Sequence, residues 1–275
     1  MRMSELPPSG RLAPWVRTIR VVEYDYAAAV TTLVPEPGLT LAIRFGGSPG
    51  ALVSGMRTTV RHLRTSAGGG VVVAALRELG AAQLFDVPMH ELFGGTYDLA
   101  DLVHRGEVSE LQERIALAGS AGARAALLDV WLCGRLRARA ADPLVARAVA
   151  AIHDAGGALR IAALARRLGT SQDPLEKRFR RVVGATPKQL ASIVRIHRVI
   201  DGLTSGITLG ELAHEAGFAD QSHLVRAFRA FTGEPPGRFL RTGPRWLLRS
   251  LNRERNAGAL HPAAIDRRDR VAARR

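Results

Sequence analysis

Two short segments in the last third of the chain carry polar side chains at the outward positions of predicted helices. In the first, Glu176 and Lys177 lie between a leucine and a phenylalanine spaced four residues apart; in the second, Gln221, Ser222 and Arg226 accompany the same apolar pattern. Residues four apart share one face of a helix, so the apolar pair would pack inward and leave these polar residues outside. Outward-facing carboxylate, amide, hydroxyl and cationic groups in such an arrangement could form hydrogen bonds to a partner.

The two segments belong to a longer repeat. Leu164–Gly169 resembles Leu212–Gly217 at an offset of 48 residues, and Leu175–Arg180 resembles Leu224–Arg229 at an offset of 49. Each copy has apolar residues at helical spacing, a glycine where the helix should end, and a second helical segment. Self-similarity of this kind indicates duplicated supersecondary units. We therefore predict two helix-turn-helix units.

Capping patterns place the neighbouring helices. Thr186–Gln189 forms a capping-box pattern that opens a predicted helix through about Leu203, which would set the distance between the two units. Thr208 and Glu211 form a second such pattern at the start of the second copy. Asp142 suits an N-cap before a proline, so we place the start of an all-α domain there and its end at 242.

The first part of the chain has a different pattern. Val21–Tyr26, Leu39–Phe45 and Val71–Ala75 are short apolar or β-branched runs separated by glycine-rich turns. Residues 1–106 are therefore predicted to form a small β-barrel or sheet. Residues 107–141 return to helical spacing and are predicted to form a helical pair that packs on the barrel or against a second copy of the chain. The fold class is α+β with two domains, followed by a basic tail at 243–275 that is predicted to be disordered.

The charge and cysteine content of the sequence limit the classes of partner that we expect. The 39 Lys and Arg against 25 Asp and Glu give a formal net charge of +14, which favours a polyanion such as double-stranded DNA. A single cysteine, Cys133, excludes an intrachain disulfide and a thiolate metal cluster. The sequence has neither a signal-peptide pattern nor an apolar run of about 18 residues, so we expect a cytoplasmic protein with no membrane partner.

The segment Gly217–Arg229, followed by Thr232–Pro236, resembles the signature of the AraC family of bacterial transcription regulators. The resemblance covers roughly 143–241. It implies seven helices, with one recognition helix from each unit entering successive major-groove segments about 34 Å apart.

Residue by residue, the resemblance implies base contacts in both units: Asp173, Glu176, Lys177, Gln221, Ser222, Val225 and Arg226. Arg180 and Arg229 are expected to hold phosphates, which fixes register without reading sequence. Asp173 and Glu176 depart from the family's usual pattern because they place acid where DNA lies. The first helix is therefore expected to make weaker or cytosine-dependent contacts. Each of these residues also fits a solvated helix face.

The N-terminal part resembles the small cupin-like barrel domains that act as sensors in this family, through Leu12–Val16, Pro35–Leu41, Gly80–Ala82 and Asp86–Leu92. That resemblance implies a domain that binds a small-molecule effector or mediates dimerisation. The candidate pocket residues are Trp15, Tyr24, Phe45 and His62, although each also fits the core or the surface.

The histidine and cysteine positions give little support for an enzymatic activity. His62, His90 and His104 are far apart and form no H-x-H pair, so no metal site or cofactor is predicted. Cys133 lies on a predicted helix without a nearby histidine, which suits a structural thiol better than a nucleophile. We predict no catalytic residues.

Together these patterns predict a nucleoid-associated activator or repressor, with DNA, an effector, RNA polymerase and a second copy of itself as partners. The alternative is a barrel-domain enzyme or sequestering protein with an accessory DNA-binding module. A purely architectural DNA-binding protein is a third hypothesis, and it would show little sequence preference.

Overall fold

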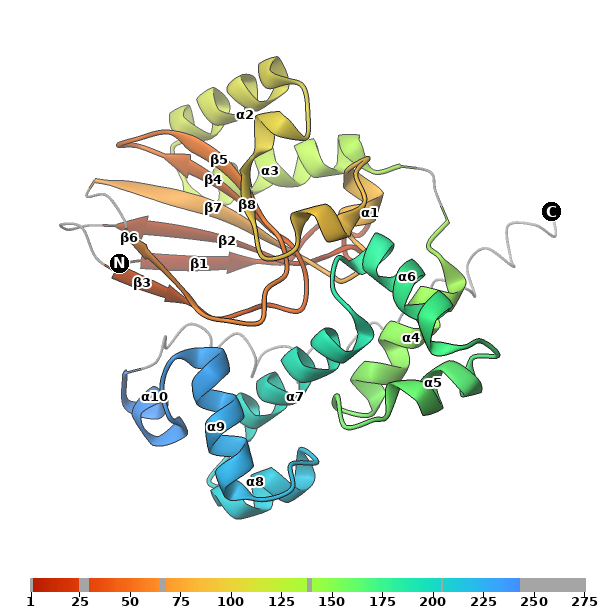
Figure 1. Cartoon of the computed structure of the whole chain (residues 1–275). Helices are drawn as coiled ribbons and strands as arrows, with labels where there is room; N and C mark the ends of the chain where they lie inside the picture. The colour runs from red at the N-terminus through yellow and green to blue at the C-terminus, as the bar shows by residue number, and fades with distance from the viewer. Residues whose placement is uncertain (1, 25–29, 65–67, 138–139, 204, 243–275) are drawn as a thin grey trace. The chain divides into compact units, whose positions relative to one another are not determined.

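The computed structural model describes residues 2–24, 30–64, 68–137, 140–203 and 205–242 (Figure 1). They form two compact units. The first contains residues up to 57 together with 62–142 and 177–185, and the second contains 58–61, 143–176 and the chain from 186 onward. The predicted disordered tail at 243–275 lies outside the described residues.

The first unit is built on an antiparallel sheet of six strands in the order β1-β2-β7-β4-β5-β8. These strands are β1 (Arg2–Leu6), β2 (Val16–Tyr24), β4 (Thr40–Phe45), β5 (Gly50–Ser54), β7 (Gly69–Leu76) and β8 (Thr96–Asp98). Two further strands, β3 (Val30–Leu33) and β6 (Arg61–Arg64), pair separately.

The sheet buries one face through alternation of side chains. Ile43 on β4 pairs with Val72 on β7 and with Ala51 on β5, and Val72 pairs in turn with Val21 on β2. All four side chains are buried, because residues in register on neighbouring antiparallel strands share one face of the sheet. This row and its neighbours form a continuous apolar surface.

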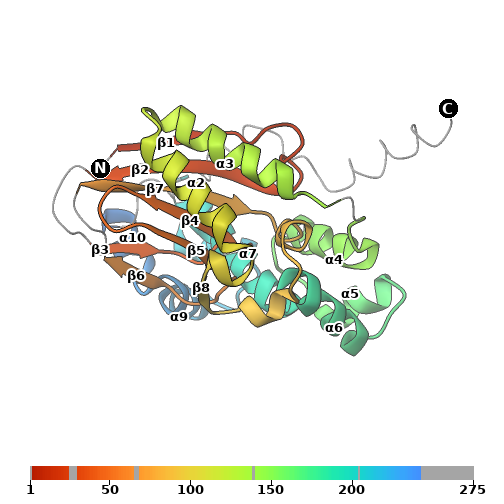
Figure 2. The ribbon, with the colours of Figure 1, turned by 90° about the horizontal axis from the view of Figure 1, so that it is seen from above.

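Two helices cover that surface, as the view from above shows (Figure 2). They are α2 (Arg105–Leu117) and α3 (Ala121–Arg135), and they contact the sheet as well as each other. Each buries a stripe at helical spacing in the same core as the strands: Val108, Leu111, Ile115, Ala125, Leu128 and Leu132. Three short segments complete the unit: α1 (Ala81–Leu84), η1 (Met89–Leu92) and η2 (Leu99–Asp101).

The α+β class with two domains is confirmed, but the predicted barrel is not closed. β1 and β8 are the two edges of the sheet, and no described residues of these strands pair with each other. A sheet must bury its apolar face either by curling on itself or against another layer. Here α2 and α3 supply that second layer, so the core does not require closure.

Residues 143–242 are helical. The helices are α4 (Pro143–Asp154), α5 (Ile161–Arg167), α6 (Gln172–Val183), α7 (Pro187–Leu203), α8 (Leu209–Glu215), α9 (Gln221–Thr232) and α10 (Pro236–Thr242). The capping box predicted at the start of α7 is present, since Thr186 and Gln189 exchange hydrogen bonds of 2.8 and 3.1 Å. Helix α7 ends at Leu203, as predicted, and contacts α4, α8 and α9.

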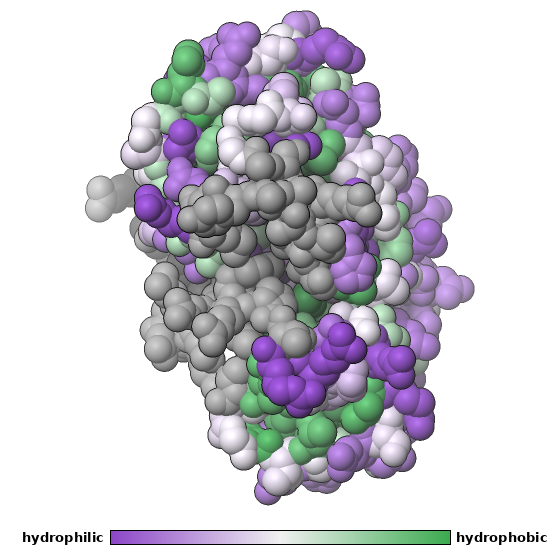
Figure 3. All heavy atoms as spheres, turned by 90° about the vertical axis from the view of Figure 1, so that its left-hand side faces the viewer, coloured by the Kyte–Doolittle hydropathy of each residue, from purple (hydrophilic) through white to green (hydrophobic). Residues whose placement is uncertain are grey.

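The surface is mixed in character. On the face drawn in Figure 3, hydrophilic residues are interspersed with smaller hydrophobic areas. Among the described residues, the large hydrophobic side chains that are exposed are Leu117, Val130 and Leu240. Within the same residues, no helix combines the length and the hydropathy needed to cross a membrane.

Leu41→Ala should destabilise the first unit by about 2–5 kcal/mol, because it removes a fully buried side chain that pairs with Val53 and Ala74 and leaves a cavity. Leu117→Ala is the matched control, since Leu117 is 87% exposed and its truncation should change stability by less than about 0.5 kcal/mol. Denaturant unfolding of both variants measures the difference. Equal effects would contradict the core assignment.

Candidate nucleic-acid interface

A glycine turn precedes each of the two predicted reader helices, α6 and α9. Gly169 follows α5 with a φ of +73°, and Gly217 follows α8 with a φ of +70°. Only glycine adopts this left-handed conformation without a steric penalty from a Cβ atom, so these residues end one helix and redirect the chain into the next. The helix-turn-helix pattern predicted from the repeat is therefore present in both copies.

Helix α9 is oriented by its buried side. Leu224 and Phe228 are fully buried, and the Phe228 ring packs edge-on against Phe239 of α10 with 5.3 Å between ring centroids. Asp220 caps the helix by accepting a hydrogen bond of 2.7 Å from the backbone N–H of His223. These contacts leave the opposite side of α9 free to face solvent.

The predicted contact residues of α9 lie on its exposed part. Gln221, Ser222, Arg226 and Arg229 are exposed, and Val225 is half-buried at the margin. The helix contains no aspartate or glutamate. Its outer face therefore combines neutral hydrogen-bonding groups with two cations, which suits the acceptor-rich edge of a major groove.

Helix α6 follows the same arrangement with a different charge pattern. Leu175 and Phe179 are fully buried. Asp173, Lys177 and Arg180 are exposed, and Glu176 is half-buried. In both copies most of the predicted contact residues are exposed on the part of the helix away from the Leu–Phe pair, whereas Gln221, in the first turn of α9, lies nearer to that pair.

The sequence analysis missed several cations near these helices. Arg181 is exposed one helical turn after Lys177, so it extends the same face of α6. Arg166 and Arg167 are exposed in the last turn of α5. The i,i+4 spacing from Lys177 would have identified Arg181 as a further phosphate-contact candidate.

The second compact unit also contains a half-buried cation, Arg195, that supports the turn before α9. Arg195 on α7 donates a hydrogen bond of 3.3 Å to the Gly157 carbonyl, and its guanidinium lies 5.1 Å from the centroid of the Phe218 ring. Burial lowers the pKa of Arg195, although an arginine remains charged at physiological pH. Its contact with Phe218 helps to hold the turn that follows Gly217.

The capping box of α8 is present as predicted. Glu211 accepts hydrogen bonds from the Thr208 hydroxyl and backbone N–H at 2.7 and 3.0 Å, and the Glu211 N–H donates to the Thr208 hydroxyl at 3.3 Å. The bonds from the side chain and the backbone of Thr208 lower the pKa of the Glu211 carboxyl, because they favour its charged form.

The four effector-pocket candidates lie in different places. Trp15 directly precedes β2 and Tyr24 ends it, so a strand of nine residues, about 30 Å long, separates them. Burial raises the pKa of Tyr24, with Arg44 acting in the opposite direction. Phe45 is a buried core residue whose ring lies 4.2 Å from the Arg124 guanidinium, and His62 is exposed.

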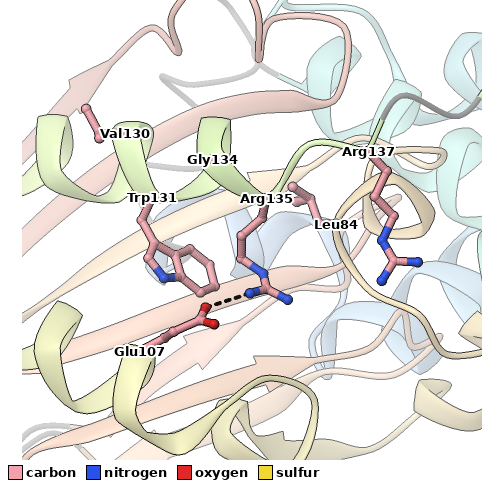
Figure 4. Close-up of a pocket in the computed structure, with 7 residues that line it drawn as sticks. All are labelled: Leu84, Glu107, Val130, Trp131, Gly134, Arg135 and Arg137. Carbon is pink, nitrogen blue, oxygen red and sulfur yellow. Dashed lines mark hydrogen bonds and ion pairs between the residues drawn. The ribbon is translucent and has the colours of Figure 1, made fainter.

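A separate hollow of about 420 Å³ opens in the first unit, where α3 meets α1 and α2 (Figure 4). Its lining consists of Leu84, Glu107, Val130, Trp131, Gly134, Arg135 and Arg137. Arg135 donates a hydrogen bond of 2.7 Å to Glu107 and lies 5.2 Å from the centroid of the Trp131 ring. Arg137 pairs with Asp86 at 2.7 Å. None of the four candidates named above lines this hollow.

In the part of the chain that the structure describes, no group of three or more His, Cys, Asp and Glu side chains is arranged to hold a metal ion. Cys133 lies on α3, where its sulfur is 3.3 Å from the Ser9 hydroxyl.

Two family profiles match separate parts of the chain. A helix-turn-helix domain matches residues 164–242, and a domain of unknown function, DUF6597, matches residues 4–98. A segment of 109 residues is 35% identical to an AraC-like transcription regulator of Streptomyces lividans, and covers 39% of this chain and 34% of that protein. An AraC-like transcription regulator of Streptomyces antibioticus is 33% identical over the same length and coverage. The chain therefore spans about a third of the length of these relatives.

The chain is less similar in sequence to the solved structures that resemble it than to these two regulators. The C-terminal domain of AraT, a response regulator from Geobacillus stearothermophilus, is 23% identical, with a TM-score of 0.35 over 37% of this chain and 86% of that one. ToxT from Vibrio cholerae is 13% identical, with a TM-score of 0.44 over 81% of this chain and 97% of that one. Both TM-scores are below 0.5, so the similarity to AraC-like regulators rests on the sequence matches.

The two capping boxes of the helical region should respond differently to acid. The lowered pKa of Glu211 means that its box stabilises the fold above the unfolded pKa of about 4.3 and loses that contribution as pH falls through the lowered value. Thr208→Ala should therefore reduce Tm at neutral pH, and its difference from the unchanged protein should shrink in acid.

Thr186→Ala is the control for this titration, because Gln189 in that box does not ionise. Its Tm difference should be nearly independent of pH. Thermal melts of both variants from neutral to acidic pH measure the two differences, and identical pH profiles would contradict the role of the Glu211 charge.

Proposed function

We propose that this chain, whose C-terminal region is an AraC-type helix-turn-helix domain, is a sequence-specific transcription regulator that inserts α6 and α9 into successive major-groove segments. The observation that supports the proposal is the duplicated helix: both α6 and α9 bury a Leu–Phe pair and expose most of the predicted contact residues, with Glu176 and Val225 half-buried. Helix α7, between the two helix-turn-helix units, has 17 residues and is about 26 Å long. We infer that α7 sets the spacing of the two helix-turn-helix units to groove segments one turn, or about 34 Å, apart.

The two helices would contribute unequally. In α9, Gln221, Ser222, Val225 and Arg226 would contact bases, with Arg226 suited to guanine and Gln221 to adenine. In α6, Asp173, Glu176 and Lys177 would do so, but the two acids repel phosphates and accept only from donors such as cytosine N4. Arg180 and Arg229, in the later turns of the two helices, would hold phosphates. We infer that α9 supplies most of the sequence preference.

The first compact unit, which contains the six-stranded sheet, would act as the sensor. The proposed domains are residues 1–106 with the helical pair of 107–141, and the DNA-binding domain of 142–242. The hollow of about 420 Å³ beside Trp131 falls in the size range of small-molecule sites, and it supports an effector role for this unit. Turnover of a compound by the full-length protein would favour the alternative of an enzyme with an accessory DNA-binding module.

The proposal is tested by selecting binding sites for the full-length protein from random duplex DNA at about 150 mM salt. The expected result is a motif of two short blocks roughly one helical turn apart, with the sharper preference in one block. Salt-sensitive binding without an enriched motif would contradict the regulator proposal and favour an architectural DNA-binding role.

Arg226→Ala should cost about 1–3 kcal/mol on the selected site and relax the preference at one base pair, because an arginine at the groove edge discriminates guanine from the other bases. Arg114→Ala is the matched control, since Arg114 is an exposed arginine of α2 that pairs with Glu110 in the first unit. Titrations on the selected site and on single-base variants give both quantities. A uniform loss on every sequence would instead make Arg226 a phosphate contact.

A further inference from the structure

One arginine of α6 is held by a carboxylate that lies outside the helix. The Nε and Nη2 atoms of Arg178 both donate to Asp142 Oδ2, at 3.0 and 2.8 Å. Asp142 directly precedes α4, and its side chain is only 19% exposed, against 52% for Arg178. Hydrogen bonds between two charged groups are the stronger kind, and a carboxylate with little access to water depends on such partners.

The position of Arg178 gives this contact a functional meaning. Arg178 follows the proposed base reader Lys177 and precedes the buried Phe179, so it projects from the flank of α6, about 100° from Lys177. A long, half-exposed arginine at that place could reach a phosphate beside the groove. While it is bound to Asp142, its guanidinium is directed to the start of α4 instead.

The two copies of the repeat differ at this point. The residue that corresponds to Arg178 in α9 is Ala227, so the second copy has no cation there to restrain. Helix α6 carries four cations, Lys177, Arg178, Arg180 and Arg181, whereas α9 carries only Arg226 and Arg229. Contacts from cations to phosphates strengthen binding to every sequence alike. Each additional phosphate contact by α6 would therefore raise affinity without improving selection.

On the premise of the function proposed above, we propose that Asp142 is a positioning residue that limits the sequence-independent affinity of the first helix-turn-helix unit for DNA. It withholds Arg178 from the DNA backbone, so that the first reader helix meets DNA through Asp173, Glu176 and Lys177. The carboxylate acts through Arg178 and does not itself contact DNA. Removing the charge of Asp142 frees the Arg178 guanidinium as one additional phosphate-binding group in the first helix-turn-helix unit.

The experiment is the salt dependence of binding to random duplex DNA by the full-length protein and Asp142→Asn, which keeps the size of the side chain and removes its charge. One additional phosphate contact should steepen the slope of log K against log salt by about 0.9. Between 50 and 200 mM salt, the affinity of the variant should then fall about threefold more than that of the unchanged protein. Its ratio of specific to non-specific affinity at one salt concentration should stay unchanged, because the added contact strengthens binding to every sequence alike.

Two further variants identify the group responsible. Arg178→Gln should leave the slope unchanged, because Arg178 does not contact DNA while Asp142 is present. The double variant Asp142→Asn with Arg178→Gln should return to the original slope. Thermal melts show whether each variant is folded. A contribution of Asp142 to stability alone would lower Tm without changing the number of counterions released.

Either of two results overturns the proposal: an unchanged slope in folded Asp142→Asn, or a shallower slope in Arg178→Gln, which would place Arg178 on the DNA in the unchanged protein. If Asp142→Asn does not fold, the slope of Arg178→Gln decides alone. Arg229→Gln reports separately on the proposed function, since losing a phosphate contact should make the slope shallower by about 0.9. A shallower salt slope in Arg229→Gln together with an unchanged slope in Asp142→Asn rejects the role of Asp142 and supports the proposed contact of α9 with DNA.

Discussion

The burial of one leucine and one phenylalanine, four residues apart, determines the orientation of each reader helix. Leu224 and Phe228 are fully buried, and so are their counterparts Leu175 and Phe179. A helix that buries this stripe can expose only the opposite side, so the identity of the outward residues follows from the core. The proposed contact residues are therefore positioned by apolar packing, and they can vary in chemistry without disturbing the fold.

This separation explains how the two copies can share a framework and differ in charge. The glycine turns at Gly169 and Gly217 belong to the shared framework, because they end one helix and set the direction of the chain into the next. The outer faces are free of that constraint, so α6 carries acids beside its cations and α9 carries none. Because phosphate contacts are insensitive to sequence, the balance of these charges bears on overall affinity for DNA, and base contacts determine the selectivity.

The first unit obeys a different constraint. Its strands alternate buried and half-exposed residues, and the rows of aliphatic side chains across β2, β7, β4 and β5 need a covering layer. Helices α2 and α3 provide it, which leaves β1 and β8 as open edges. The same helices form the walls of the hollow beside Trp131, so a ligand held there would contact elements that pack directly on the sheet.

The sequence by itself determined the features that depend on local periodicity: the repeat, the turn glycines, the capping boxes and the inward Leu–Phe pairs. It also indicated the class of the first unit, since alternation shows that a strand has one buried face. Tertiary structure alone decided what covers that face, because periodicity does not distinguish a closed barrel from a sheet under helices. It also decided which distant charges meet. Glu5 lies opposite Arg20 only through the register of β1 and β2, and Asp142 reaches Arg178 across 36 residues of sequence, contacts that no local pattern encodes.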